Sequence, residues 1–284
     1  MKIVTGQTVL LTGANGGLGV YMTRALADRQ TKLALVAFPG VGLEALREEV
    51  SARGAQAMVL VSDLRDPAQR RSVVEQVREK FGPIDILIND AGVEFTSAYH
   101  DLSEENLHDI INVNLEAAMV LTRLVLPEML QRRRGHIVCI SSLAGRSGPA
   151  FQEPYAATKA GLVAFTSSLR ASYRREGVSA SVVTPGFVEA GIYAKLKARS
   201  GCSAPVMLGT SRPETVARAV IRAIERDKPE IIVNPLPVRP LLALSALLPS
   251  VGEWVINQIG TNDFFRRVVE AEKRAAERKE PLTF

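Results

Sequence analysis

Six short apolar segments alternate with longer amphipathic stretches along the first 184 residues, and this alternation leaves few folds open to the chain. The segments are rich in Val, Ile and Leu, as β-strands are, and cover residues 7–12, 32–38, 56–61, 84–89, 136–141 and 179–184. The stretches between them place charged residues on one face, as helices do. Because the strands are apolar on both faces, they predict a parallel sheet buried between two helical layers, which is a doubly wound α/β fold.

The chain continues past this pattern into a segment of different character. Residues 212–225 predict one more helix and residues 231–233 a last short strand, so we expect a single domain over residues 1–234. Beyond it, we expect residues 235–284 to form a helical extension packed on the domain. Its apolar segment 241–248 is too short to cross a membrane. An oligomer contact, a substrate entrance and a membrane-surface patch remain as alternative roles.

Composition and charge narrow the cellular location and the partners. The net charge is only +5, and the basic clusters at residues 132–134 and 266–279 lack interleaved aromatic residues, so we expect no nucleic-acid partner. The two cysteines cannot form a disulfide framework, and no secretory signal is visible at the start of the chain. These features predict a cytoplasmic protein, and we expect no metal site.

The first strand is followed by a glycine-rich turn, TGANGGLG, over residues 12–19. Glycines at a strand-to-helix turn let the backbone approach a diphosphate, and the next helix offers free N–H groups at its N-terminus. Asp63 follows the third strand, and the sequence NDAG of residues 89–92 follows the fourth. Since ligands bind at the carboxyl ends of strands in open α/β sheets, we predict a dinucleotide site at this edge.

A serine, a tyrosine and a lysine form a candidate catalytic group. Ser142 follows the fifth strand, and Tyr155 and Lys159 stand four residues apart in a predicted helix, on one face. An ammonium near a phenol lowers the phenol pKa, so that the tyrosine can exchange a proton with an alcohol or carbonyl oxygen. Ser142 can hydrogen-bond the same oxygen. The pattern predicts acid–base chemistry at a carbonyl or an alcohol.

These motifs occur in a fixed order: TGANGGLG, NDAG, NVN at residues 112–114, Ser142 with the Tyr155-x3-Lys159 pair, and Pro185-Gly186. Together they resemble the short-chain dehydrogenase/reductase family over about residues 5–234, and within it the 3-oxoacyl-carrier-protein reductases and hydroxysteroid dehydrogenases. The resemblance implies a Rossmann-type fold. It also implies an NAD(P)-dependent oxidoreductase that interconverts a carbonyl and a secondary alcohol by hydride transfer.

The resemblance also implies roles for individual residues. Tyr155 is the proton donor or acceptor, and Ser142 polarises the substrate oxygen. Lys159 holds the nicotinamide ribose and lowers the Tyr155 pKa, and Asn114 supports Lys159 through water in a proton relay. The residues implied to line the cofactor site are Gly13, Asn15, Gly16, Leu18, Gly19, Phe38, Asp63, Leu64, Asn89, Ala91, Gly92, Tyr155, Lys159, Pro185, Gly186 and Val188.

Three places depart from the family pattern. Asp90 stands where the family has the second Asn of NNAG, and Ala190 replaces a Thr whose side chain would hold the cofactor. Ala37 and Phe38, at the end of the second strand, offer neither the acidic residue that selects NAD nor the Arg that selects NADP. Since no acid repels a 2′-phosphate there, we expect NADP(H) to be favoured slightly over NAD(H).

Other functions on the same fold are possible. Epimerases of the extended branch share Tyr-x3-Lys, but they usually run longer than this chain. A non-catalytic dinucleotide sensor or scaffold would be expected to lose the tetrad, and all four residues are present. Residues 187–211 are the expected lid, and their apolar members favour an apolar small-molecule carbonyl or alcohol. We also expect a homo-oligomer, either a dimer or a tetramer, with peripheral membrane contact through the extension as an alternative.

Overall fold

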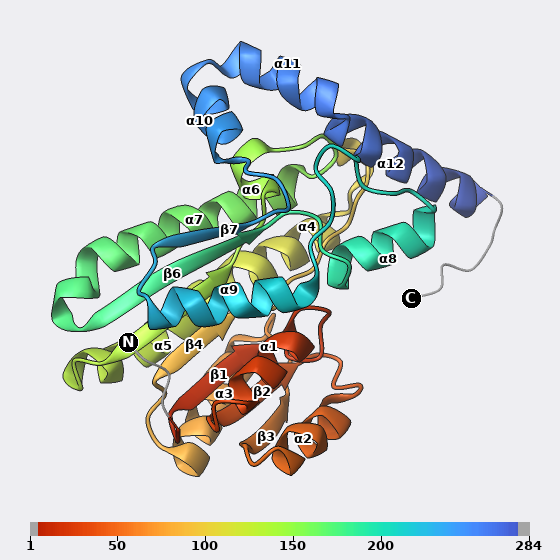
Figure 1. Cartoon of the computed structure of the whole chain (residues 1–284). Coiled ribbons are helices and arrows are strands. Elements are labelled where there is room, and N and C mark those ends of the chain that lie inside the picture. The colour runs from red at the N-terminus through yellow and green to blue at the C-terminus, as the bar shows by residue number, and fades with distance from the viewer. Residues whose placement is uncertain (1–4, 278–284) are drawn as a thin grey trace.

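The structure, a computed structural model, describes residues 5–277 and is built around a parallel sheet of seven strands (Figure 1). The strand order is β3-β2-β1-β4-β5-β6-β7. The strands are β1 (Thr8–Thr12), β2 (Lys32–Ala37), β3 (Gln56–Val61), β4 (Ile86–Asn89), β5 (Gly135–Ile140), β6 (Val178–Pro185) and β7 (Glu230–Val233). The predicted strands agree with these bounds to within two residues, and the doubly wound α/β fold is confirmed.

The strand order reverses direction at β1. This strand pairs with β2 on one side and β4 on the other, so that Thr12 lies opposite both Val36 and Asn89. The connections after β1 and β4 therefore lead away to opposite sides of the sheet. Such a reversal leaves a crevice beyond the carboxyl ends of the strands, which is where open α/β sheets bind ligands.

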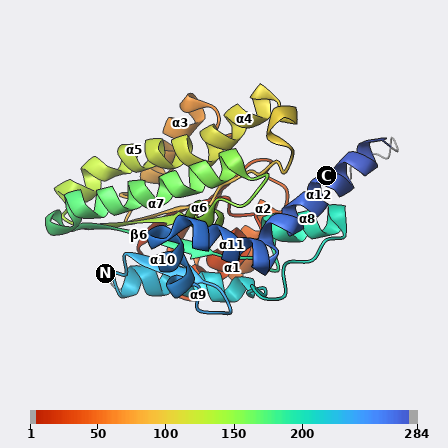
Figure 2. The same cartoon turned by 90° about the horizontal axis from the view of Figure 1, so that it is seen from above.

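Two layers of helices cover the sheet (Figure 2). One face carries α1 (Gly19–Ala27), α2 (Leu43–Ala52) and α9 (Pro213–Glu225), and the other carries α3 (Pro67–Phe81), α4 (Glu104–Ile111), α5 (Ala117–Gln131) and α7 (Glu153–Tyr173). Alternate residues of β1 enter opposite cores. Leu11 packs in the cluster that contains Leu26, and Leu10 packs in the cluster that contains Leu121. Burial on both faces explains why the middle of β1, residues 9–11, is apolar throughout.

The helical stretch from Glu104 to Gln131 is continuous but changes geometry at its middle. Asn112–Glu116 form a π-helical turn, a feature often found at functional sites, and this turn buries Asn114. By length and composition, the stretch is the one helix in the described part of the chain that could cross a membrane. Its residues Leu121 and Val125 are buried in the core under the sheet, as expected for a core helix.

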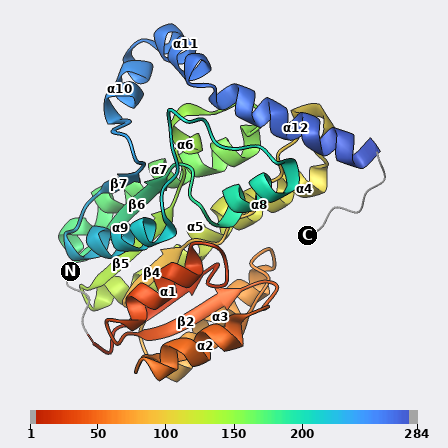
Figure 3. The ribbon, with the colours of Figure 1, turned by 45° about the vertical axis from the view of Figure 1, so that its right-hand side comes forward.

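Three helices follow the last strand: α10 (Arg239–Leu247), α11 (Pro249–Ile259) and α12 (Thr261–Glu277) (Figure 3). Helix α12 docks on α8 (Gly191–Ser200), where Phe264 and Val268 pack with Tyr193 and Leu196. Helices α10 and α11 pack mainly on each other and approach the short helix α6 (Ala144–Ser147). Residues 1–4 and residues 278–284, the last part of the expected extension, lie outside the described residues.

His136 is a buried titratable group in β5. Its Nε2 lies 2.8 Å from Ser181 Oγ, and that hydroxyl donates its own hydrogen to the carbonyl oxygen of Lys228 at 2.6 Å. Nε2 must therefore carry the hydrogen of a neutral ring. Burial lowers the pKa of His136 to about 4.

We predict that the free energy of unfolding falls as the pH drops below about 6.5, because the unfolded chain then protonates His136 and the folded chain does not. Between about pH 7.5 and pH 5, this residue accounts for a loss of about 2 kcal/mol. The variant His136→Gln keeps a hydrogen-bond donor but cannot titrate, so it should lose correspondingly less stability. Urea unfolding of the wild type and the variant at the two pH values measures the difference. The prediction is contradicted if the free energy of unfolding falls equally in both proteins between the two pH values.

Candidate active site

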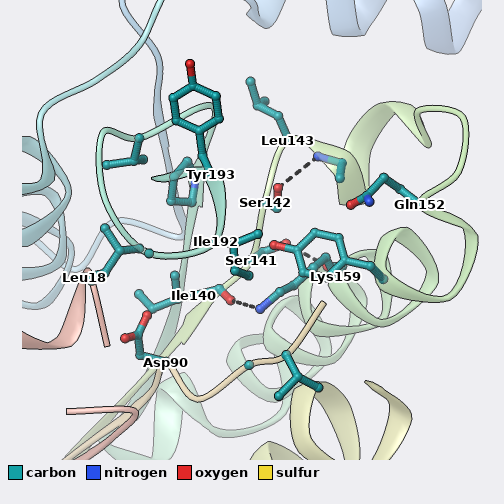
Figure 4. A pocket seen from close by; sticks show the side chains of 18 of the residues that line it. Leu18, Asp90, Ile140, Ser141, Ser142, Leu143, Gln152, Lys159, Ile192 and Tyr193 are labelled. Carbon is teal, nitrogen blue, oxygen red and sulfur yellow. Dashed lines mark hydrogen bonds between the residues drawn. The ribbon is translucent and has the colours of Figure 1, made fainter. Parts of the chain in front are cut away.

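One continuous cavity of about 680 Å³ fills the crevice beyond the carboxyl ends of the strands. Its first part is lined by the glycine turn and by the ends of β2 and β3. Its middle is lined by Tyr155 together with Ser142 and Lys159, both of which Figure 4 labels. The expected lid segment lines its far part together with residues of α10, α11 and α12. Most of the predicted cofactor residues and three of the four predicted catalytic residues therefore share one cavity, and Asn114 is not among its lining residues.

The glycine turn brings backbone atoms too close together for any side chain. A Cβ on Gly19 would stand 2.1 Å from the carbonyl oxygen of Gly13, and a Cβ on Gly17 would stand 2.0 Å from the amide nitrogen of Gly191. Gly13 also has a φ of +71°, which favours glycine. The turn leads directly into the N-terminus of α1, where free N–H groups attract a diphosphate. This cradle fits the dinucleotide implied by the sequence.

An arginine that the sequence analysis did not single out lies at the end of β3. Arg65 pairs with Asp63 at 2.7 Å and with Asp109 at 2.8 Å, and all three residues line the cavity. Hydrogen bonding from Arg65 holds the pKa of Asp63 below its usual value. Arg65 stands two residues after Asp63 in the sequence. Asp109 comes from α4, and nothing in the sequence around Arg65 predicts their contact.

Most residues predicted to line the cofactor site do line the cavity: Gly13, Asn15, Gly16, Leu18, Phe38, Asp63, Leu64, Ala91, Gly92, Tyr155, Lys159, Pro185, Gly186 and Val188. Gly19 lies behind the turn and supports it, and Asn89 is buried in β4. The side chain of Asn15 donates to the carbonyl oxygen of Pro39 at 2.8 Å and so also holds the loop after β2. Among residues 5–277, no group of three or more His, Cys, Asp or Glu side chains is arranged to hold a metal ion.

Helix α7 presents the tyrosine and the lysine to the middle of the cavity. The Nζ of Lys159 donates to the carbonyl oxygen of Ile140 at 3.0 Å (Figure 4). It lies 5.6 Å from the centroid of the Tyr155 ring. Ser142 follows β5, accepts a hydrogen bond from the amide of Ala144 at 3.1 Å and is hydrogen-bonded to Tyr155. The structure thus brings these three predicted catalytic residues together.

Burial has the largest effect on the pKa of Tyr155 and raises it above its ordinary value. The hydrogen bond with Ser142 lowers this pKa, and the charges of Glu94 and Asp90 raise it. In the structure burial has the larger effect, and the lowering of the Tyr155 pKa by Lys159 stays a prediction. Burial also lowers the pKa of Lys159, against the opposing effect of Asp90. Tyr155 is therefore a protonated phenol at neutral pH.

Asn114 is held by the loop that follows β4. Its Oδ1 accepts from the amide of Val93 at 2.7 Å, and its Nδ2 donates to the carbonyl oxygen of the same residue at 2.9 Å. A Cβ on Gly92 would stand 3.3 Å from Asn114 Oδ1 and 3.5 Å from Lys159 Nζ, so both polar atoms face the same small space. The water relay between Asn114 and Lys159 stays a prediction.

The far part of the cavity is apolar and draws on distant segments of the chain. The lid contributes Phe187, Ile192 and Tyr193, and the last helices contribute Leu241, Leu242, Ile256, Ile259 and Phe265. The sequence left a substrate entrance open as one role of the extension, but no local signal shows which of its residues reach the cavity. Gln152 was also missed, although it lines the cavity and stands three residues before Tyr155. Gln152 precedes α7 as its N-cap residue and lies outside the predicted helix, so its spacing from Tyr155 did not identify it.

Comparison with known proteins agrees with this geometry. Residues 7–201 match the model of the short chain dehydrogenase family. The ketoacyl reductase HetN of Nostoc sp. is 40% identical over 275 residues, which are 95% of each protein. The 3-oxoacyl-[acyl-carrier-protein] reductase FabG of Escherichia coli is 36% identical over 65% of this chain and 74% of that protein. A solved variant of the actinorhodin polyketide ketoreductase with NADPH has a TM-score of 0.74 and 28% identity, over 81% of this chain and 97% of its own.

These matches confirm the resemblance carried by the five motifs. All three named relatives are reductases, so they give no support to a non-catalytic sensor or scaffold. The family model covers more than half of the chain, and HetN covers nearly all of it. The chain belongs to the short-chain dehydrogenase/reductase family and is an NAD(P)-dependent oxidoreductase of carbonyls and alcohols.

Proposed function

We propose that this enzyme reduces an apolar ketone to a secondary alcohol, with Tyr155 as the acid that protonates the carbonyl oxygen. The observation that carries the proposal is the buried, protonated phenol of Tyr155 in a cavity whose far part is apolar. A buried phenol holds its proton until a strong base forms beside it, and the developing alkoxide of a reduced ketone is such a base. The apolar wall favours a substrate with a hydrocarbon body.

Each polar side chain in the middle of the cavity has a separate role in the reduction of the substrate carbonyl. A bound nicotinamide dinucleotide supplies the hydride. Ser142 donates a hydrogen bond to the oxygen on which negative charge develops. Lys159 places positive charge near the tyrosinate that remains after proton transfer, which stabilises that anion. Asn114 supports Lys159 by holding the loop after β4 beside it.

We propose that NADP(H) is favoured only slightly over NAD(H). The end of β2 carries Ala37 and Phe38 and therefore has no carboxylate to repel a 2′-phosphate. Arg65 supplies a cation to the same end of the cavity, but it is already paired with Asp63 and Asp109. Both features argue against a strong preference. The actinorhodin ketoreductase structure holds NADPH, which supports the direction of the preference.

We also propose a cytoplasmic homo-oligomer in which a second copy covers the outer side of α10 and α11. That side leaves Leu247 79% exposed and Trp254 62% exposed, next to Leu244, Leu248 and Val251. Exposed apolar patches of this kind mark contact surfaces. The segment from Pro240 to Gly252 carries no charge, so contact with a membrane surface is the competing proposal.

Replacing Tyr155 by Phe removes the transferable proton but keeps the ring and its packing. We expect kcat for ketone reduction to fall by about 10² to 10⁴-fold, with the cofactor affinity retained. Lys159→Ala should lower both kcat and the cofactor affinity, because Lys159 also lines the cofactor site. Tyr173→Phe, at the far end of α7, is the matched control and should keep wild-type turnover. A wild-type kcat for Tyr155→Phe would exclude Tyr155 as the acid.

Fluorescence titration with NADPH and with NADH measures the cofactor preference directly. We expect NADPH to bind more tightly by less than tenfold, or about 1.4 kcal/mol. Phe38→Arg should increase this ratio, because a guanidinium pairs with a 2′-phosphate. A hundredfold preference of the wild type in either direction would contradict the proposal.

Replacing both Leu247 and Trp254 by Ser removes the most exposed part of the apolar surface. If a second copy covers it, light scattering should show an oligomer for the wild type and a smaller species for the variant. If a membrane covers it, the wild type should instead sediment with anionic vesicles and the variant should not. A wild-type monomer that does not sediment would refute both proposals.

A further inference from the structure

The side-chain amide of Gln152 is held in one orientation. Its Nε2 donates to Glu94 Oε1 at 2.6 Å and to Thr96 Oγ1 at 2.9 Å, and it lies 3.3 Å from the carbonyl oxygen of Phe151. An amide nitrogen has two hydrogens to donate, and these three oxygens receive them. The reversed amide would place its oxygen against a carboxylate and a carbonyl, which repel it. The nitrogen of Gln152 is therefore fully engaged.

Glu94 determines this orientation. Its Oε1 accepts hydrogen bonds from the hydroxyl of Thr96 and from Gln152. Because the Thr96 hydroxyl donates its one hydrogen to Glu94, it can act only as an acceptor toward the Gln152 amide. Burial raises the pKa of Glu94, whereas both hydrogen bonds and the charge of Arg199 lower it. A carboxylate accepts hydrogen bonds and donates none. With Glu94 in place, the amide nitrogen faces it and the amide oxygen faces the other way.

The amide oxygen of Gln152 is directed to the cavity. Gln152 lines the cavity beside the catalytic residues, whereas Glu94, Thr96 and Phe151 do not. Figure 4 shows the Gln152 side chain pointing toward Ser142 across this space. Gln152 is only 3% exposed, and no described hydrogen bond is accepted by its Oε1. A substrate that displaces water from this wall must supply a donor or leave the acceptor unpaired, which is unfavourable.

We infer that Glu94 holds Gln152 so that its amide oxygen accepts a hydrogen bond from the substrate, and that this substrate carries a hydroxyl or N–H group near its reacting carbonyl. The inference rests on the proposed function, since it describes the substrate of the same Tyr155 site. It adds one polar requirement to an otherwise apolar substrate. Glu94 acts as a positioning residue, and Gln152 as the residue that determines specificity. A site built to bond a hydroxyl discriminates against an analogue without one.

The test uses ketones in matched sets, with NADPH and the full-length enzyme. Each set has a hydroxyl group two, three or four carbons from the carbonyl, a methyl ether at the same position, and a hydrogen there. In at least one set, the wild type should favour the hydroxyl member in kcat/KM by about tenfold or more. Glu94→Leu removes the acceptor that orients Gln152, so the preference should fall to near one, mainly through KM. Glu94→Gln keeps an acceptor oxygen and should restore the preference.

Each outcome decides between the two proposals. A wild type that reduces none of the ketones with NADPH or NADH would refute the proposed function. Reduction without any preference for a hydroxyl group would refute the inference and leave the proposed function standing. A preference that survives in Glu94→Leu would also refute the inference. If Glu94→Leu does not fold, Gln152→Leu replaces it, and a retained hydroxyl preference in that variant would refute the inference equally.

Discussion

The pairing of β1 with β2 on one side and β4 on the other is the contact on which the whole site depends. It places the turns after β1 and β4 side by side while their helices leave toward opposite faces of the sheet. The close approach of Gly17 to Gly191 then brings the segment after β6 against the glycine turn. Any side chain at Gly17 would separate these two backbones. The cavity exists because three connections meet at this reversal of strand order.

Burial gives the groups in this cavity their chemistry. Tyr155 stays protonated because a phenolate is poorly solvated there, and the lysine beside it donates to a backbone carbonyl. The apolar far wall continues this environment toward the substrate. Aromatic contacts close the wall: Phe264 of α12 lies 5.1 Å from the ring of Phe187. The end of the chain therefore completes a site whose catalytic groups come from its middle.

Parts of this arrangement followed from local patterns. The apolar strands predicted the parallel sheet because only burial on both faces explains them, and the i, i+4 spacing predicted that Tyr155 and Lys159 share a face. The spacing did not show that burial would have the largest effect on the pKa of Tyr155 and raise it, because burial depends on how distant segments pack around α7. The resemblance implied Asn89 and Gly19 at the cofactor, and in the structure neither lines the cavity, so their contact with the cofactor stays a prediction. In the extension, α12 packs on α8, whereas α10 and α11 leave large apolar side chains exposed.

The sequence by itself determined the layered α/β fold, the glycine turn at the first crossover and the order of Ser142, Tyr155 and Lys159, because each depends on residues that are close along the chain. Only the tertiary structure decided three other features. These are the part of the cavity wall formed by the last helices, the two carboxylates that pair with Arg65, and the orientation of the Gln152 side-chain amide. Glu94 and Gln152 come from different loops, and their hydrogen bond exists because β4 and β5 are neighbours in the sheet. Contacts between distant segments depend on how the whole core packs, and no short stretch of sequence contains that information.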